Sequence, residues 1–185
     1  VGDNVWEISQ DILGVTDGID DFQERKYSFK IELMRKIEHW TARQFETVIT
    51  PSKYLKGIIS AWDVHESKIQ VIYNAVKMPE VVESRDVLRN KFNITGKTYL
   101  TVARITPWKG IDTLIDLFSK RKDNLIIIGN GPLFNEMKEK SKNLKNVKLL
   151  GKLPKQDVYR YMKACDGFIL NSGYEGLPHV VIEAL

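Results

Sequence analysis

The second half of the chain alternates short apolar runs with amphipathic segments. Mainly apolar runs at positions 99–103, 125–128, 147–150 and 168–170 are typical of buried strands. Apolar residues at three- to four-residue spacing predict helices over 110–121, 132–142 and 155–164, and a last helix from Pro178 onward. Buried strands that alternate with helices predict an α/β fold, in which a parallel sheet is covered by helices on both faces.

The first half shows a similar alternation over residues 22–76. Apolar positions at three- to five-residue spacing predict one long amphipathic helix over 22–45, followed by strands at 47–50 and 69–73. Pro51 and Ser52 end the first strand and cap a helix over 53–61. We expect a loop over residues 1–21, a linker over 78–84 and a short helix over 85–92.

Composition is that of an ordinary globular protein, with 43% apolar and 28% charged residues. The sequence shows no apolar run near the roughly 20 residues of a spanning helix and no signal or lipidation motif, so we expect a cytoplasmic location. Cys165 has no second cysteine to pair with and is expected to be a small buried residue rather than a nucleophile.

The net charge of +4 is unevenly distributed along the chain. Residues 1–78 carry a net charge of −2 and residues 79–185 carry +6, so we expect an anionic ligand in the second half. Nucleic acid would be one such ligand. However, the basic residues are scattered along helices and do not interleave with aromatic residues, so we expect no nucleic-acid partner.

Four loops follow the predicted strands of the second half, and parallel strands place such loops at one edge of the sheet. The first, Ala-Arg-Ile-Thr-Pro-Trp-Lys-Gly at 103–110, carries Arg104 and Lys109, which together could neutralise a diphosphate; the alternative is two surface cations beside a turn. In the fourth, Pro178 begins a helix whose free N–H groups favour a phosphate. Glu175 and Glu183 flank this helix start and would accept hydroxyls, which points to a sugar nucleotide.

The segment from Glu175-Gly176-Leu177-Pro178 to Glu183-Ala184 resembles the E-x7-E signature of retaining glycosyltransferases of family 4, and residues 103–110 resemble their R-x(3–5)-KG motif. Two Glu eight positions apart are common on surface helices, so the order of all four loops carries the resemblance. It implies a GT-B fold with two Rossmann-like domains, both incomplete here. Residues 1–78 would belong to the acceptor-side domain, 79–96 to a linker with its helix, and 97–185 to the nucleotide-sugar domain.

The resemblance also implies roles for individual residues. Arg104 and Lys109 would stabilise the leaving diphosphate, Glu175 would hold hydroxyls of the donor sugar, and Glu183 would hold the ribose hydroxyls. The remaining donor-binding residues would be Gly129 and Asn130 in the second loop, Lys152 and Leu153 in the third, and Gly176, Leu177 and Pro178 in the fourth. His179 is expected to cap or pack at the helix start. His39 and His65 do not match the histidine of the family's N-terminal domain, so we assign no catalytic residue there.

The implied reaction is transfer of a hexose from a nucleoside-diphosphate sugar to a hydroxyl of a glycan or lipid-linked acceptor, with retention of configuration. A sugar-nucleotide epimerase of the same architecture and a non-catalytic nucleotide-sugar-binding module are the alternatives. The nucleotide half has no Asp-x-Asp pair, so we expect no essential metal and no cofactor. The chain begins without Met and ends within a predicted helix, so we expect it to be a fragment that is itself inactive.

The predicted helix over 22–45 has two interpretations. Its basic residues could rest on the inner face of an anionic membrane, which would make the protein peripheral. The alternative is a helix packed on a sheet, because glutamates balance most of these cations.

Overall fold

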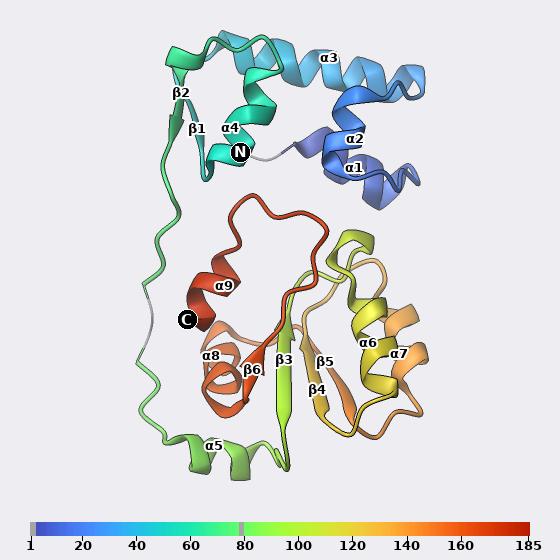
Figure 1. Cartoon of the computed structure of the whole chain (residues 1–185), viewed down its shortest axis with the longest axis vertical. Helices are drawn as coiled ribbons and strands as arrows, with labels where there is room; N and C mark the ends of the chain where they lie inside the picture. Colours follow the sequence, from blue (N-terminus) through green and yellow to red (C-terminus); the bar gives the residue numbers. More distant parts are fainter. Residues whose placement is uncertain (1–2, 78–79) are drawn as a thin grey trace. The chain divides into compact units, whose positions relative to one another are not determined.

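The computed structural model describes residues 3–77 and 80–185, and the chain divides into two compact units (Figure 1). Unit 1 comprises residues 1–75 and 174–178, and unit 2 comprises residues 76–173 and 179–185. The predicted domain boundary between residues 78 and 79 lies outside the described residues.

Unit 1 contains a two-stranded parallel sheet and several helices. Val48 to Thr50 in one strand pairs in register with Ile69 to Val71 in the other. Its elements are α1 (Asn4–Ile12), α2 (Ile19–Glu24), α3 (Phe29–Gln44), β1 (Val48–Thr50), α4 (Lys53–Ser60), the 3₁₀ turn Glu66–Lys68 and β2 (Ile69–Val71). Ser52 caps α4 by accepting a hydrogen bond from the Leu55 N–H at 3.2 Å, as the sequence predicted.

The single helix predicted over 22–45 was wrong, because the chain breaks at Arg25. There the backbone is extended, and the Arg35 guanidinium donates to the carbonyls of Gln23 and Arg25 at 2.9 and 3.0 Å. The Tyr27 ring returns onto Phe22, 4.8 Å away between ring centres. The Arg35 side chain on α3 thus satisfies backbone carbonyls that lack helical hydrogen bonds at the break. Apolar spacing alone does not indicate such a break.

The loop predicted over residues 1–21 was also wrong, since α1 occupies part of it. The Asp3 side chain caps this helix by accepting from the Trp6 N–H at 2.7 Å. Val5 and Trp6 are buried, and the Trp6 indole donates to the Asp17 carbonyl at 3.0 Å. The first residues of the predicted loop, 1 and 2, lie outside the described residues.

Unit 2 is built on a four-stranded parallel sheet in the order β5-β4-β3-β6. The chain moves outward from β3 through β4 to β5 and then returns to the other side of β3, so the strand order reverses beside β3. Its elements are α5 (Arg85–Lys91), β3 (Thr98–Val102), the 3₁₀ turn Pro107–Lys109, α6 (Ile111–Ser119), β4 (Asn124–Ile128), α7 (Phe134–Ser141), β5 (Val147–Gly151), α8 (Lys155–Ala164), β6 (Gly167–Phe168) and α9 (His179–Ala184).

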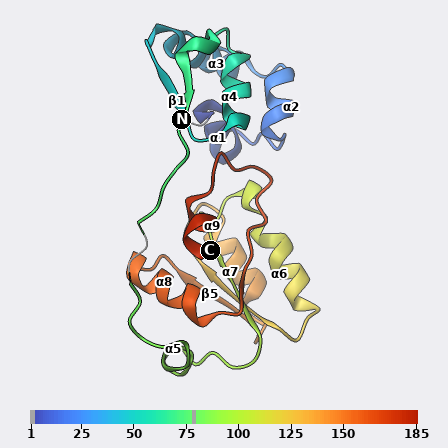
Figure 2. The same ribbon diagram turned by 60° about the vertical axis from the view of Figure 1, so that its left-hand side comes forward.

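Helices cover both faces of this sheet, with α6 and α7 on one face and α5 and α8 on the other (Figure 2). Along β4, Leu125 and Ile127 enter the core beneath α6 and α7, whereas Ile126 and Ile128 enter the core beneath α5 and α8. Successive side chains of a strand point to opposite faces, so a strand covered on both sides needs an unbroken apolar run. This is why the sequence pattern predicted the strand.

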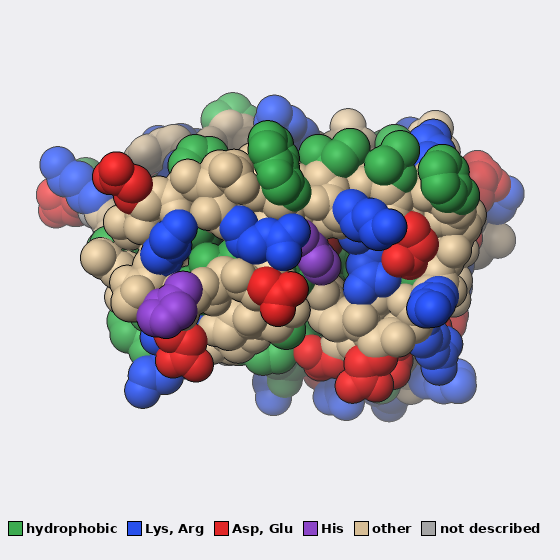
Figure 3. Space-filling view, turned by 90° about the horizontal axis from the view of Figure 1, so that it is seen from above, with side chains coloured by type: hydrophobic (Ala, Val, Ile, Leu, Met, Phe, Trp, Pro, Cys, Tyr) green, Lys and Arg blue, Asp and Glu red, His purple; other side chains and the backbone are tan. Residues whose placement is uncertain are grey.

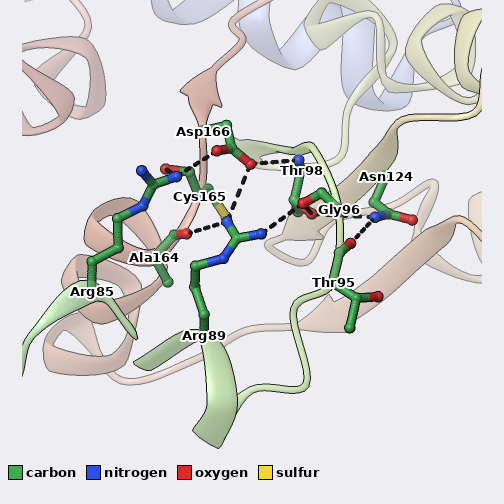
Figure 4. A network of polar contacts seen from close by, with 9 residues as sticks. All are labelled: Arg85, Arg89, Thr95, Gly96, Thr98, Asn124, Ala164, Cys165 and Asp166. Atoms are coloured by element: carbon green, nitrogen blue, oxygen red, sulfur yellow. Dashed lines mark hydrogen bonds and ion pairs between the residues drawn. The ribbon is translucent and has the colours of Figure 1, made fainter. Parts of the chain in front are cut away.

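At the amino-terminal end of the sheet, Asp166 ties α5 to the strands (Figure 4). Its carboxylate accepts from the Thr98 N–H at 2.8 Å and pairs with Arg85 and Arg89 at 2.5 and 3.2 Å. The Arg89 guanidinium also donates to the carbonyls of Ala164 and Gly96 at 3.1 and 2.6 Å. These contacts fix α5 against the starts of β3 and β6.

Candidate functional site

The loops at the carboxyl ends of the unit 2 strands are hydrogen-bonded to one another. The first and second loops are joined by Ile105 N–H to the Asn130 carbonyl at 3.0 Å. Gly129 N–H joins the second loop to the third at the Gly151 carbonyl, 2.9 Å away, and Gly173 N–H joins the fourth to the first at the Trp108 carbonyl, 2.7 Å away. Backbone contacts therefore gather the four loops at one edge, beside the reversal of strand order where open α/β sheets bind ligands.

Two glycines of the second loop allow this close approach. A Cβ at Gly129, whose φ is +148°, would lie 1.8 Å from the Ala103 carbonyl oxygen. A Cβ at Gly131 would lie 2.3 Å from the Ile105 carbonyl oxygen. The loop backbones are in direct contact, so these glycines are required by the packing of the protein itself, whatever ligand the edge binds.

The two predicted cations lie on the first loop. Arg104 follows β3 and is exposed, whereas Lys109 ends the 3₁₀ turn and is half-buried. Gly110, at a φ of +57°, then begins α6, and its carbonyl accepts from the Asn171 side chain at 3.1 Å. One short segment thus carries both cations at the edge where the four loops meet.

In the second and third loops, the predicted donor-binding residues have varied surroundings. Asn130 is exposed, and its side-chain oxygen accepts from the Gly131 N–H at 2.8 Å. Lys152 is exposed, whereas Leu153 packs against the core beneath α5 and α8. The Leu153 side chain is therefore occupied by the core, and any ligand contact there falls to its backbone.

Residues 174–178 of the fourth loop belong to unit 1, where their contacts are local. The Asn74 side chain donates to the Leu177 carbonyl at 3.2 Å, and Tyr174 lies edge-on to Trp6 with ring centres 5.0 Å apart. A Cβ at Gly176 would lie 2.7 Å from the Leu55 side chain. Glu175 and Pro178 are half-buried in the same segment.

Glu183 lies on α9 in unit 2, and two side chains of α8 contact it. The Tyr159 hydroxyl donates to its Oε1 at 2.9 Å, and the Lys155 ammonium pairs with the same oxygen at 2.8 Å. This hydrogen bond and the one to Tyr159 raise the pKa of Lys155. Neither partner was predicted from the sequence, because no motif links positions 155 and 159 to 183 before α8 and α9 are packed together. His179 begins α9 and is exposed.

Unit 1 holds a separate apolar cavity of about 420 Å³ between α1, α3 and β1. Glu38 lies on its wall and accepts hydrogen bonds from the N–H groups of Asn4 and Val5 at 3.0 and 3.4 Å. Burial, together with the neighbouring charge of Asp3, raises the pKa of Glu38 to about 7.

The remaining candidate side chains have structural surroundings. Cys165 is buried in the core beneath α5 and α8, which raises its pKa to about 12 and confirms the prediction of a small buried residue. His65 caps the 3₁₀ turn of unit 1, and His39 stacks on Trp62 with ring centres 4.7 Å apart. Within the described residues no group of three or more His, Cys, Asp or Glu could hold a metal ion. The absence of an essential metal or cofactor stays a prediction.

Comparison with known proteins decides the family. The family described as "Glycosyl transferases group 1" matches residues 84–185, more than half of the chain and all of the loops described above. The chain belongs to this family. This confirms the resemblance drawn from the sequence motifs.

The chain is similar in sequence to two curated relatives. It is 30% identical over 154 residues to the alpha-monoglucosyldiacylglycerol synthase of Streptococcus pneumoniae, covering 75% of this chain and 35% of the relative. It is 28% identical over 180 residues to an uncharacterized glycosyltransferase of Methanocaldococcus jannaschii, covering 90% of this chain and 43% of the relative. The chain thus spans less than half the length of either relative.

The fold is also shared with solved structures. The Anabaena protein HepE, crystallised with UDP and glucose, superposes with a TM-score of 0.73 at 21% identity over 85% of this chain and 46% of that chain. The architecture is therefore of the GT-B type, with parallel Rossmann-like sheets flanked by helices, as the sequence predicted. The ligand roles of individual residues and the assignment of residue ranges to the two domains of that fold stay predictions.

Proposed function

We propose that this protein transfers a hexose from a nucleoside-diphosphate sugar to an acceptor hydroxyl, with retention of configuration, in glycan, polysaccharide or glycolipid synthesis. One observation carries the proposal: four strand-end loops, one of them bearing Arg104 and Lys109, are hydrogen-bonded together where the strand order reverses. HepE, which shares the fold, was crystallised with UDP and glucose, and the pneumococcal relative is named as a glycolipid synthase. Since the chain spans under half of these proteins, activity is proposed for the whole protein.

The chemistry follows from charge. The bond between sugar C1 and the diphosphate oxygen breaks with its electron pair on the diphosphate, and the sugar develops oxocarbenium character. The Arg104 guanidinium suits a pair of phosphate oxygens and the Lys109 ammonium adds a point charge, so both stabilise the leaving group without a metal. The acceptor oxygen bonds to C1 on the face that the diphosphate leaves, and its proton passes to the diphosphate.

The other assigned residues bind the donor. Glu175 accepts hydroxyls of the sugar, and the backbone from Gly176 through Leu177 to Pro178 contacts sugar and phosphate. Glu183 accepts the ribose hydroxyls. Gly129 and Asn130 line the nucleotide pocket, and Lys152 and Leu153 meet the base.

Replacing Glu175 by Gln tests the assignment. Transfer should fall by at least about 100-fold, because the variant loses a charged contact to the reacting sugar, while affinity for the nucleotide is retained. The assay is sugar release and transfer from UDP-, GDP- and ADP-sugars, with calorimetric titration of UDP, GDP and ADP. Glu136→Gln, an exposed position on α7, is the control. Undiminished transfer by Glu175→Gln refutes its role, and affinity without transfer by the unaltered protein indicates a binding module.

We also propose a cytoplasmic location with peripheral contact to an anionic membrane through α3. Phe29, Leu33, Ile37 and Trp40 recur along one side of this helix and are 84%, 46%, 55% and 59% exposed. In the face seen in Figure 3, hydrophobic side chains lie beside Lys and Arg side chains. An exposed apolar row next to cations matches an interfacial helix. Among the described residues no helix is long and apolar enough to cross a membrane.

Sedimentation with vesicles tests this contact. The protein should bind vesicles that contain phosphatidylglycerol, bind neutral phosphatidylcholine vesicles less, and lose binding when Trp40 is replaced by Ser. Leu117→Ser, at an apolar position on α6 that is 49% exposed, is the control. Equal binding by the Trp40 variant and the unaltered protein would contradict the proposal and favour α3 as a packing helix.

A further inference from the structure

The contacts of Glu183 show how its carboxylate is held. Tyr159, only 4% exposed, donates to Oε1 from the buried side of α8. Lys155 reaches the same oxygen from one turn earlier, with its ammonium 5.5 Å from the centre of the Tyr159 ring. Positions four apart lie on one face of a helix, so the two donors form a pair aimed at α9.

Both donors use one of the two carboxylate oxygens. Within the described residues the other oxygen, Oε2, makes no hydrogen bond, although the Glu183 side chain is only 11% exposed. A carboxylate held through one oxygen has a fixed orientation and keeps acceptor capacity on the other. Lys155 also compensates its charge, which would otherwise repel a nearby diphosphate.

We propose that Tyr159 and Lys155 are positioning residues that orient Glu183 to accept the ribose hydroxyls of the donor. The inference rests on the proposed function, in which Glu183 binds that ribose. Neither residue needs to touch the donor: Tyr159 supplies a rigid, buried hydrogen bond, and Lys155 supplies charge at the more exposed end. Their effect is on donor affinity and on discrimination of ribose from deoxyribose, and the chemical step is left unchanged.

A merely structural role would look different. Tyr159 and Lys155 could serve only to join α8 to α9, in which case their loss would lower stability and affinity without regard to the sugar of the nucleotide. Recognition of ribose hydroxyls is therefore the deciding readout. This readout is the ratio of the affinities of one variant for a nucleotide and for its deoxy forms. General damage to the fold lowers both affinities alike and leaves the ratio unchanged.

The test is calorimetric titration of UDP, GDP and ADP and of their 2′-deoxy and 3′-deoxy counterparts. The unaltered protein should bind one ribonucleotide at least about tenfold more tightly than a deoxy form, since a hydrogen bond to a charged group is lost. Tyr159→Phe and Lys155→Met should weaken ribonucleotide binding about three- to tenfold and deoxynucleotide binding much less. Lys155→Arg should restore most of the loss, and kcat should change less than KM.

Two control variants accompany these. Tyr161→Phe removes a hydroxyl from the same helix at a residue stacked on Phe92, and Lys138→Met removes a cation from α7. Both should bind like the unaltered protein. In combination with Glu183→Gln, Tyr159→Phe should add almost nothing to the loss, because it acts through that carboxylate.

The outcomes separate the two proposals. If the unaltered protein prefers the ribonucleotide and the folded Tyr159→Phe variant keeps the same preference, the positioning role is overturned and the proposed function stands. Absence of any preference for ribose in the unaltered protein overturns the positioning role together with the ribose-binding role of Glu183, and leaves the proposed transfer to be decided by Glu175→Gln. If it binds none of the three nucleotides, the proposed function fails and the inference fails with it.

Discussion

Replacing Gly129 by Ala should lower the stability of unit 2 more than a Gly-to-Ala replacement at any other glycine of the four loops. The added Cβ would lie 1.8 Å from the Ala103 carbonyl oxygen, whereas real Cβ contacts are essentially never under 3.0 Å. The loop would have to move by more than about 1 Å, because close-packed backbones cannot interpenetrate. Backbone is the obstacle, so no side-chain rotation can relieve the overlap.

The cost can be worked out from the contacts that would separate. Ile105 N–H to the Asn130 carbonyl and Gly129 N–H to the Gly151 carbonyl would both lengthen. Each contributes about 1 kcal/mol, and a non-glycine residue at a φ of +148° adds about 1 to 3 kcal/mol of strain. We therefore expect a loss of about 3 to 5 kcal/mol, a large part of the 5 to 15 kcal/mol typical of a domain.

Urea unfolding followed by far-ultraviolet circular dichroism measures this loss. Gly96→Ala is the matched control, since Gly96 has a φ of +67° in the same unit but only a side-chain atom 3.8 Å from its added Cβ. The control should lose about 1 to 2 kcal/mol from backbone strain alone. A Gly129 variant that loses no more stability than the Gly96 variant would refute the packing argument, because the overlap with the Ala103 carbonyl would then cost nothing.

Two further predictions concern charged groups. Burial acts to raise the pKa of Asp166, but the hydrogen bonds from Thr98, Arg85 and Arg89 lower it below the ordinary carboxyl value. The stabilisation by the Asp166 carboxylate is therefore present above the ordinary carboxyl pKa and is lost as pH falls through the lowered value. Asp166→Asn should cost about 2 kcal/mol at pH 7 and flatten the stability profile below pH 4; an unchanged urea midpoint would contradict this. The pKa of Glu38 is raised to about 7, so unit 1 should lose stability as pH rises from about 4.5 through 7. Glu38→Gln should remove that slope, and a slope that persists would assign it to another group.

The sequence by itself determined most of the secondary structure of unit 2, because a strand covered on both faces and an amphipathic helix each leave a local pattern. The unbroken run at 125–128 is an example, and its strand, Asn124–Ile128, lies within one residue of the predicted bounds. The exception is β6 (Gly167–Phe168), which shares only Phe168 with the strand predicted over 168–170. The motif pairs Arg104 with Lys109 and Glu175 with Glu183 were recognised from the sequence, since the members of each pair are close along the chain; their roles stay predictions. The gathering of the loops at one edge followed from a general rule for parallel sheets, whereas the strand order came only from the structure.

Only the tertiary structure decided the features that depend on residues distant in sequence. The break of the predicted helix at Arg25 depends on a guanidinium ten residues away, and the reason for Gly129 lies in the carbonyl of Ala103. The hydrogen bond from Tyr159 to Glu183 joins α8 to α9 through residues that lie 24 positions apart. Periodicity reports what one element buries, but it cannot report which side chain of another element will meet it.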